Sequence, residues 1–274
     1  MIPAFEDKAE LFKWLHSNKS MLIAQKKSAL KYADAVTYVP QTIFEDKNKV
    51  ACKSILIPED ATQIKVRAII NTTKLIDSHN DVHIDGLWTK SIKENNSNYL
   101  VNQHDFTFEG ILSDDVKVSA IQMTWKELGF NYKGSTQALV YDAIFDKADN
   151  PLMFEKYRTG KVKQHSVGMR YIKLDMAIND EDYPTEKSTW DKYIDVVANQ
   201  QEAIDEGYFW AVTEAKNIEG SAVVRGANFA TPTQSIEQTK FEPVKITHTP
   251  EPMQITPIDL DKMLNHYSKI LTNG

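Results

Sequence analysis

The chain has 274 residues, enough for one large domain or for one domain with appendages. Its formal net charge of -6 argues against direct nucleic-acid binding, because neutralising phosphates needs a surplus of Lys and Arg. The single cysteine, Cys52, excludes an intrachain disulfide and fits a reducing compartment. No apolar run is long enough to span a bilayer and the N-terminus turns acidic at once, so we expect a cytoplasmic protein that makes no membrane contact.

Residues 1–60 are predicted to form a helical arm followed by an irregular connector. Apolar residues recur at helical spacing over residues 7–16 and again over residues 19–35. Pro40 and Pro58 interrupt regular structure in the connector. We expect the two helices to pack on the main domain, and the alternative is that they dock on a partner protein.

Residues 61–231 are predicted to form the main domain. Alternating apolar positions predict strands over residues 64–71, 99–104, 116–125, 136–146, 166–174, 208–213 and 219–225. Helices are predicted over residues 88–95, 151–158 and 185–206. Asn150–Pro151 marks the start of the second, and the third is an insertion between two strands of one sheet. Many short strands with a few helices predict an α+β fold, with a mostly antiparallel barrel or sandwich core and peripheral helices.

The composition changes after Thr231. Five of the ten prolines lie between residues 232 and 257, which predicts an extended linker there. An amphipathic helix is predicted over residues 258–274, with Thr256 as its cap and Pro257 in its first turn. A helix at the end of such a tether docks either on its own domain or on another protein, and the sequence favours neither.

Three polar residues in strand-like contexts are candidates for a catalytic triad. Ser166 begins one strand, His104 ends another and Glu219 begins a third. A serine hydroxyl becomes a nucleophile when a base takes its proton, and a third group usually orients that base. Glu219 would orient the imidazole of His104. Backbone N–H groups near Gly168 could form an oxyanion hole, to which Arg170 could add positive charge.

The residues alone leave alternatives open. His165 adjoins Ser166, but neighbours along a strand point to opposite faces of the sheet, which makes this histidine a poor base. Glu214 and Asp105 rival Glu219 as the group that orients the base. Each residue type, taken singly, is more often structural than catalytic.

The polar stretch of residues 77–86 raises the question of a metal site. His79 and His83 are four residues apart, with Asp81 between them. That spacing places two ligands on one metal in a helix, but the alternating apolar residues and Gly86 do not predict a helix. We therefore interpret the stretch as a solvated turn and expect neither a metal nor another cofactor. A metallohydrolase is a distant third hypothesis.

Three short motifs follow one another in a fixed order along residues 64–231. His104 ends an Asn-x-His-Asp segment, Ser166 lies in a Ser-x-Gly strand, and Glu219 begins a Glu-x-Ser-x-Val segment that Ala-Asn follows. In this order the motifs resemble the prohead proteases of tailed bacteriophages, which share the fold of the herpesvirus assemblin-like proteases. Met169 and the insertion of residues 179–207 depart from the pattern, and the herpesvirus relatives use a second histidine as the third triad member.

The resemblance implies a serine endopeptidase that works as a homodimer inside the immature phage capsid, in the host cytoplasm. It implies that scaffold and major capsid protein segments are the substrates. Proteases of this kind often cut themselves as well, so self-cleavage is a further expectation. The proline-rich tail and the terminal helix would then be a targeting or scaffold-like appendage that self-cleavage can remove. The alternative is a non-enzymatic capsid assembly or scaffold protein with a β-rich core.

Overall fold

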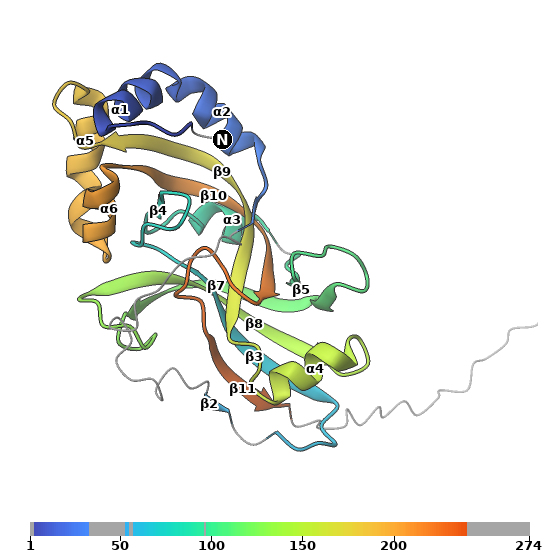
Figure 1. The fold of residues 1–274 in the computed structure, drawn as a ribbon. Coiled ribbons are helices and arrows are strands. Elements are labelled where there is room, and N and C mark those ends of the chain that lie inside the picture. The colour runs from blue at the N-terminus through green and yellow to red at the C-terminus, as the bar shows by residue number, and fades with distance from the viewer. Residues whose placement is uncertain (1–2, 33–52, 55–56, 96, 240–274) are drawn as a thin grey trace, which may run out of the picture. The chain divides into compact units, whose positions relative to one another are not determined.

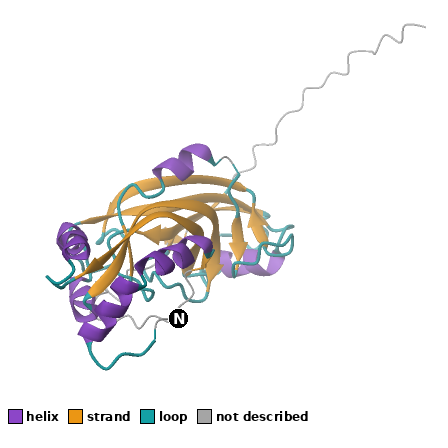
Figure 2. Cartoon of the chain, turned by 90° about the horizontal axis from the view of Figure 1, so that it is seen from above, coloured by secondary structure: helices purple, strands orange, loops and turns teal. Residues whose placement is uncertain are grey.

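The computed structural model describes residues 3–32, 53–54, 57–95 and 97–239. Within them the fold is α+β, with two mostly antiparallel sheets and helices at their periphery (Figures 1 and 2). The predicted α+β class is therefore confirmed, although neither sheet closes into a barrel in the described part of the chain. Cys52, most of the predicted linker and the predicted C-terminal helix lie outside the described residues.

The six-stranded sheet is built around two long neighbouring strands, β9 and β10 (Figure 1). Its strands are β1 (Lys31–Tyr32), β9 (Gln164–Ile178), β10 (Tyr208–Val223), β5 (Leu100–Asn102) and β6 (Ile111–Ser113) in spatial order, and β4 (Asp81–His83) also pairs with β10. β9 and β10 are antiparallel, whereas β4 and β5 run parallel to β10. The β9–β10 ladder therefore sets the position of every other strand in this sheet.

The five-stranded sheet has β3 near its middle. Its strands are β2 (Lys53–Ser54), β11 (Thr233–Gln238), β3 (Gln63–Thr72), β8 (Ser135–Asp146) and β7 (Asp115–Thr124) in spatial order. β11 pairs with β3 and buries Ile236, so residues assigned above to a linker belong to this sheet. Pro232 stands just before β11, where its missing N–H interrupts no ladder.

One core is shared by both sheets. The two predicted apolar faces of β3 and β8 are confirmed, because both are fully buried; they are Ile64, Val66, Ala68 and Ile70, and Leu139, Tyr141, Ala143 and Phe145. The same cluster contains Met169 and Tyr171 of β9 and Trp210 and Val212 of β10. The period-two alternation of these strands therefore places their apolar sides against one another.

The helices are α1 (Lys8–Ser17), α2 (Lys19–Ser28), α3 (Thr89–Glu94), α4 (Pro151–Arg158), α5 (Pro184–Tyr193) and α6 (Gln200–Glu206). α4 begins as its sequence predicts, because the side chain of Asn150 accepts a hydrogen bond from the backbone N–H of Met153 at 3.1 Å. The predicted packing of the N-terminal arm on the main domain is confirmed, since Leu15 and Leu22 belong to the shared core. In the described part of the chain, none of the helices has the length and apolar character that a membrane span requires.

Two predicted helices and two predicted strands have different bounds in the structure. The helix predicted over residues 19–35 ends at Ser28, because Ala29 is extended and the chain enters β1. The helix predicted over residues 185–206 is broken, because the side chain of Asn199 bonds both backbone groups of Ile76. The strands predicted over residues 208–213 and 219–225 are one strand, β10, with bulges between them.

Candidate active site

The register between β9 and β10 places Ser166 and Glu219 on the same face of the sheet. Ser166 is directly opposite Ser221, and Gly168 is directly opposite Glu219. Opposed residues in an antiparallel pair project to the same side, as do residues two apart along a strand. These four positions therefore form one patch, whereas Val167 and Met169 belong to the shared core on the opposite face.

His104 reaches this patch from the end of β5. Its imidazole Nδ1 lies 2.6 Å from Oε1 of Glu219, and the two side chains are only 7% and 3% exposed. Its backbone N–H donates to Oγ of Ser221 at 2.8 Å. Ser221 is in turn the cross-strand partner of Ser166, which is 1% exposed. The structure thus brings His104 and Glu219 into contact beside Ser166, from three segments that are distant in the sequence.

The backbone that carries His104 is held in an unusual conformation. Gln103 and His104 have φ angles of 52° and 58°, in the left-handed region that costs a residue other than glycine about 1 kcal/mol. The backbone N–H of Gln103 donates to the carbonyl of Ala222 at 2.9 Å, and Ser221 accepts from the next N–H. β10 therefore fixes the turn that directs the imidazole back over the sheet.

Gly168 provides the space that the carboxylate of Glu219 occupies. A Cβ atom at position 168 would lie 2.2 Å from Oε1 of Glu219, closer than any van der Waals contact allows. The sequence suggested a different role for this glycine, in an oxyanion hole, and that role stays a prediction. Arg170 is exposed opposite Lys216, and the alternation of β9 places it on the face of Ser166.

The rival candidates have other partners. His165 is fully buried, with Nε2 3.0 Å from the hydroxyl of Tyr157 and Nδ1 3.2 Å from the carbonyl of Thr231. Burial lowers the pKa of His165 to about 4. The expectation that its side chain diverges from Ser166 is confirmed.

The two rival carboxylates also lie in other surroundings. Glu214 forms ion pairs with Lys173 and Lys90, and the hydrogen bond and charge of Lys173 lower its pKa. Asp105 belongs to the turn after His104, where its backbone N–H donates to the carbonyl of Asn102 at 2.9 Å. Glu219 is the carboxylate whose oxygen contacts the imidazole of His104.

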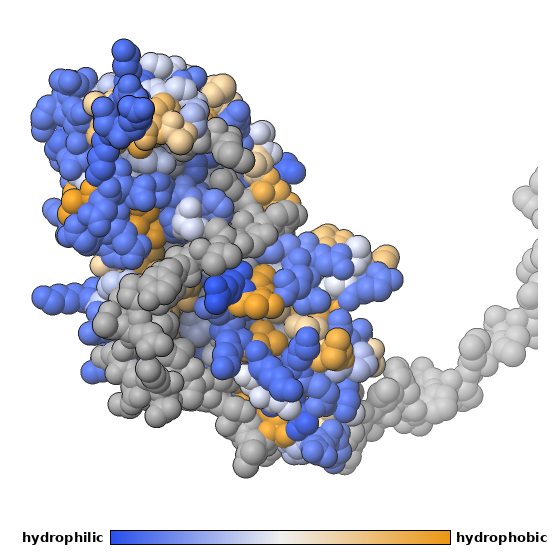
Figure 3. Space-filling view, in the orientation of Figure 1, coloured by the Kyte–Doolittle hydropathy of each residue, from blue (hydrophilic) through white to orange (hydrophobic). Residues whose placement is uncertain are grey.

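Exposed apolar side chains flank the patch. Phe106 and Phe108, in the loop after His104, are 54% and 93% exposed, and Val224 at the end of β10 is 81% exposed. Phe106 packs edge-on against Tyr99 with ring centroids 5.3 Å apart. Figure 3 shows that the face turned to the viewer is largely hydrophilic with smaller apolar areas. Large exposed apolar groups beside the patch are a surface that a polypeptide could contact.

The interpretation of residues 77–86 as a solvated turn is wrong for Asp81 and His83, which are buried in β4. Asp81 forms an ion pair with Lys26 of α2 and accepts a hydrogen bond from the hydroxyl of Tyr171 at 2.8 Å. The ring of His83 lies between that hydroxyl, at 3.1 Å, and the amide of Asn71, at 3.2 Å. These contacts join the N-terminal arm to both sheets through a buried polar network.

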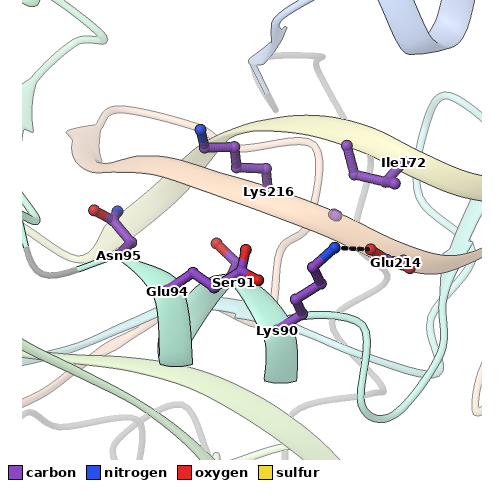
Figure 4. A pocket seen from close by; sticks show the side chains of 8 residues that line it. Lys90, Ser91, Glu94, Asn95, Ile172, Glu214 and Lys216 are labelled. Carbon is purple, nitrogen blue, oxygen red and sulfur yellow. Dashed lines mark ion pairs between the residues drawn. The ribbon is translucent and has the colours of Figure 1, made fainter.

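A separate pocket of about 270 Å³ lies beside α3, between this helix and β10 (Figure 4). Its charges are mixed, with Lys90 directed toward Glu214 and with Lys216 and Glu94 on its rim. The hydroxyl of Ser91 is already used, because it accepts from the backbone N–H of Asn217 at 2.9 Å. We therefore assign no chemistry to this pocket.

Comparison of the chain with family models, with curated proteins and with solved structures finds no match.

The close contact at Gly168 predicts strong coupling between this residue and Glu219. We expect Gly168→Ala to destabilise the fold by about 1–3 kcal/mol, because the added methyl group forces the carboxylate away from His104. Urea unfolding of Gly168→Ala, Glu219→Ala and the double variant measures this coupling as a mutant cycle. The destabilisation caused by Gly168→Ala should largely disappear when residue 219 is already alanine. An equal loss in both backgrounds would contradict this account of the glycine.

The burial of His165 predicts an acid-sensitive stability. Its pKa falls from 6.5 to about 4 on folding, so the unfolded chain takes up the proton first as the pH falls. The free energy of unfolding is therefore unaffected by this group above pH 6.5 and falls as the pH drops toward 4. The loss totals roughly 3 kcal/mol, at about 1.4 kcal/mol per pH unit. Urea unfolding across this range should show a shallower pH dependence for His165→Gln than for the unmodified protein. The exposed His79→Gln is the control, and parallel profiles for His165→Gln and the unmodified protein would refute the prediction.

Proposed function

We propose that the chain is a serine endopeptidase with the triad Ser166, His104 and Glu219. The observation that supports this proposal best is the 2.6 Å contact between His104 and Glu219, on the face of the β9–β10 pair that carries Ser166. A buried imidazole oriented by a carboxylate beside a serine is the arrangement that activates a hydroxyl. The burial of all three side chains strengthens the electrostatic interaction between imidazolium and carboxylate.

The proposed reaction has two steps. The hydroxyl oxygen of Ser166 attacks the peptide carbonyl while His104 takes its proton, and His104 then gives the proton to the departing amine. Water afterwards hydrolyses the acyl-enzyme by the same proton transfers. Glu219 holds Nδ1, which leaves Nε2 as the nitrogen that exchanges the proton. Backbone N–H groups near Gly168 are the proposed oxyanion donors, and Arg170 is the proposed source of additional positive charge.

The order of the three motifs supports a narrower proposal, a protease of phage capsid maturation with a herpesvirus-protease-like barrel or sandwich. Its substrates would be scaffold and major capsid protein segments, cut without a cofactor by a homodimer inside the immature capsid in the host cytoplasm. Two mostly antiparallel sheets with peripheral helices are compatible with that fold. Exposed Phe106 and Phe108 beside His104 are compatible with polypeptide substrates.

One observation also fits the alternative, a non-enzymatic capsid assembly protein. Exposed apolar side chains such as Phe108 and Val224 are common in protein–protein interfaces. The two functions differ in what they require of Ser166, because only an enzyme needs this hydroxyl to react. Chemical reactivity of Ser166 therefore separates them.

A fluorophosphonate probe tests the triad directly. We expect the probe to label the unmodified protein, to leave Ser166→Ala unlabelled, and to react at least about 100-fold more slowly with His104→Ala and Glu219→Gln, because base catalysis is lost. Ser135→Ala, at an exposed serine at the start of β8, is the matched control and should react like the unmodified protein. Equal labelling of the unmodified protein and Ser166→Ala would refute the proposed function.

Self-processing is a separate consequence of the proposal. Intact-mass analysis of the purified unmodified protein should show loss of a terminal segment, with a cut in the proline-rich stretch on the C-terminal side of β11. Ser166→Ala should keep its full mass, because the same hydroxyl performs the cut. Identical termini in the two proteins would show that the chain does not process itself.

A further inference from the structure

The outer edge of β9 is the side of this strand that does not face β10, and the chain itself covers it around Ser166. β1 pairs with it in antiparallel register, with Lys31 opposite Met169 and Tyr32 opposite Gly168. At the other end, Gln164 forms a bridge with Pro232, and the backbone N–H of His165 donates to the carbonyl of Thr231 at 3.1 Å. The chain's own backbone therefore pairs with this edge two residues after Ser166 and one residue before it.

An uncovered strand edge is a natural binding site for an extended peptide, because each unpaired backbone group can bond the added strand. β1 is antiparallel to β9, so a peptide that paired in the same direction would continue past Tyr32 toward the position opposite Ser166. In its register, a peptide that continued two residues past the position of Tyr32 would lie opposite Ser166. The two residues of β1 thus occupy the places of substrate residues on the N-terminal side of the bond to be cut.

We propose that Lys31–Tyr32 is an intramolecular occupant of the substrate-binding edge, which an extended substrate must displace. This regulation rests on the proposed endopeptidase function. The occupant is part of the same chain, so its effective concentration at the edge is high and independent of protein concentration. If β1 is displaced in about one molecule in ten, the apparent affinity for a peptide is reduced about tenfold.

The arm that leads into β1 is anchored to the domain. α2 ends at Ser28, only three residues before Lys31, and Leu22 of α2 is buried in the shared core. Lys26 of the same helix forms an ion pair with the fully buried Asp81, and its Nζ lies 5.3 Å from the ring centroid of Trp210. This anchor holds the start of β1 close to β9, and loosening it should favour release of the edge.

The test measures peptide binding in the full chain with Ser166→Ala, so that no turnover occurs. The probe is a fluorescein-labelled peptide with the sequence of residues 29–36, and the readout is fluorescence anisotropy. Lys31→Pro/Tyr32→Pro removes both backbone N–H groups of β1, whereas the control Lys31→Ala/Tyr32→Ala keeps them. We expect the proline variant to bind the peptide at least about tenfold more tightly than the parent, and the alanine variant to bind within about twofold of the parent.

Lys26→Met provides a second route to the same result, because it loosens the anchor and leaves β1 unchanged. It should tighten peptide binding several-fold, whereas the exposed Lys27→Met should not. Unchanged affinity in both the proline variant and Lys26→Met would overturn the proposal, and if the proline variant does not fold, Lys26→Met decides alone. Tighter binding by a protein whose Ser166 does not react with the fluorophosphonate would refute the hydrolase and leave β1 as the occupant of a peptide-binding edge. A reactive Ser166 together with unchanged peptide affinity in the variants would support the hydrolase and refute the proposed role of β1.

Discussion

The contact between His104 and Glu219 is the interaction on which the candidate site depends. Several locally unfavourable features make it possible: the left-handed backbone of Gln103 and His104, a glycine where a side chain would clash, and a carboxylate that is almost completely buried. A buried ion pair seldom stabilises a protein more than apolar side chains of the same volume would. Features that cost stability at one place are typical of functional sites, where they are retained for the geometry that they provide.

That contact in turn depends on the register between β9 and β10. A slip of one residue would turn either strand over and move its polar residues to the core side. The long ladder prevents such a slip, because Met176 and Trp210 at one end and Val167 at the other are buried in the same core. The insertion of α5 and α6 connects the two strands without disturbing their pairing near Ser166.

The sequence could predict the features that local patterns determine. Alternation predicted the buried faces of β3 and β8, and Asn150–Pro151 predicted the start of α4. It could not predict features that distant residues impose. Asn199 interrupts a helix because it bonds Ile76, and Asp81 is buried because Lys26 and Tyr171, both far from it in the sequence, supply its partners.

The candidate site shows the same division. The order of three short motifs singled out Ser166, His104 and Glu219, but motifs alone do not give a register or the conformation of Gln103. In this chain the side chain that contacts the imidazole of His104 is a carboxylate, Glu219. The structure gives a physical reason why a carboxylate can stand there. Gly168 leaves room opposite, so that the side chain of Glu219 can extend over β9 and reach Nδ1 of His104. Gly168, two residues after Ser166, is therefore linked to the carboxylate at position 219, and the two residues should be changed together.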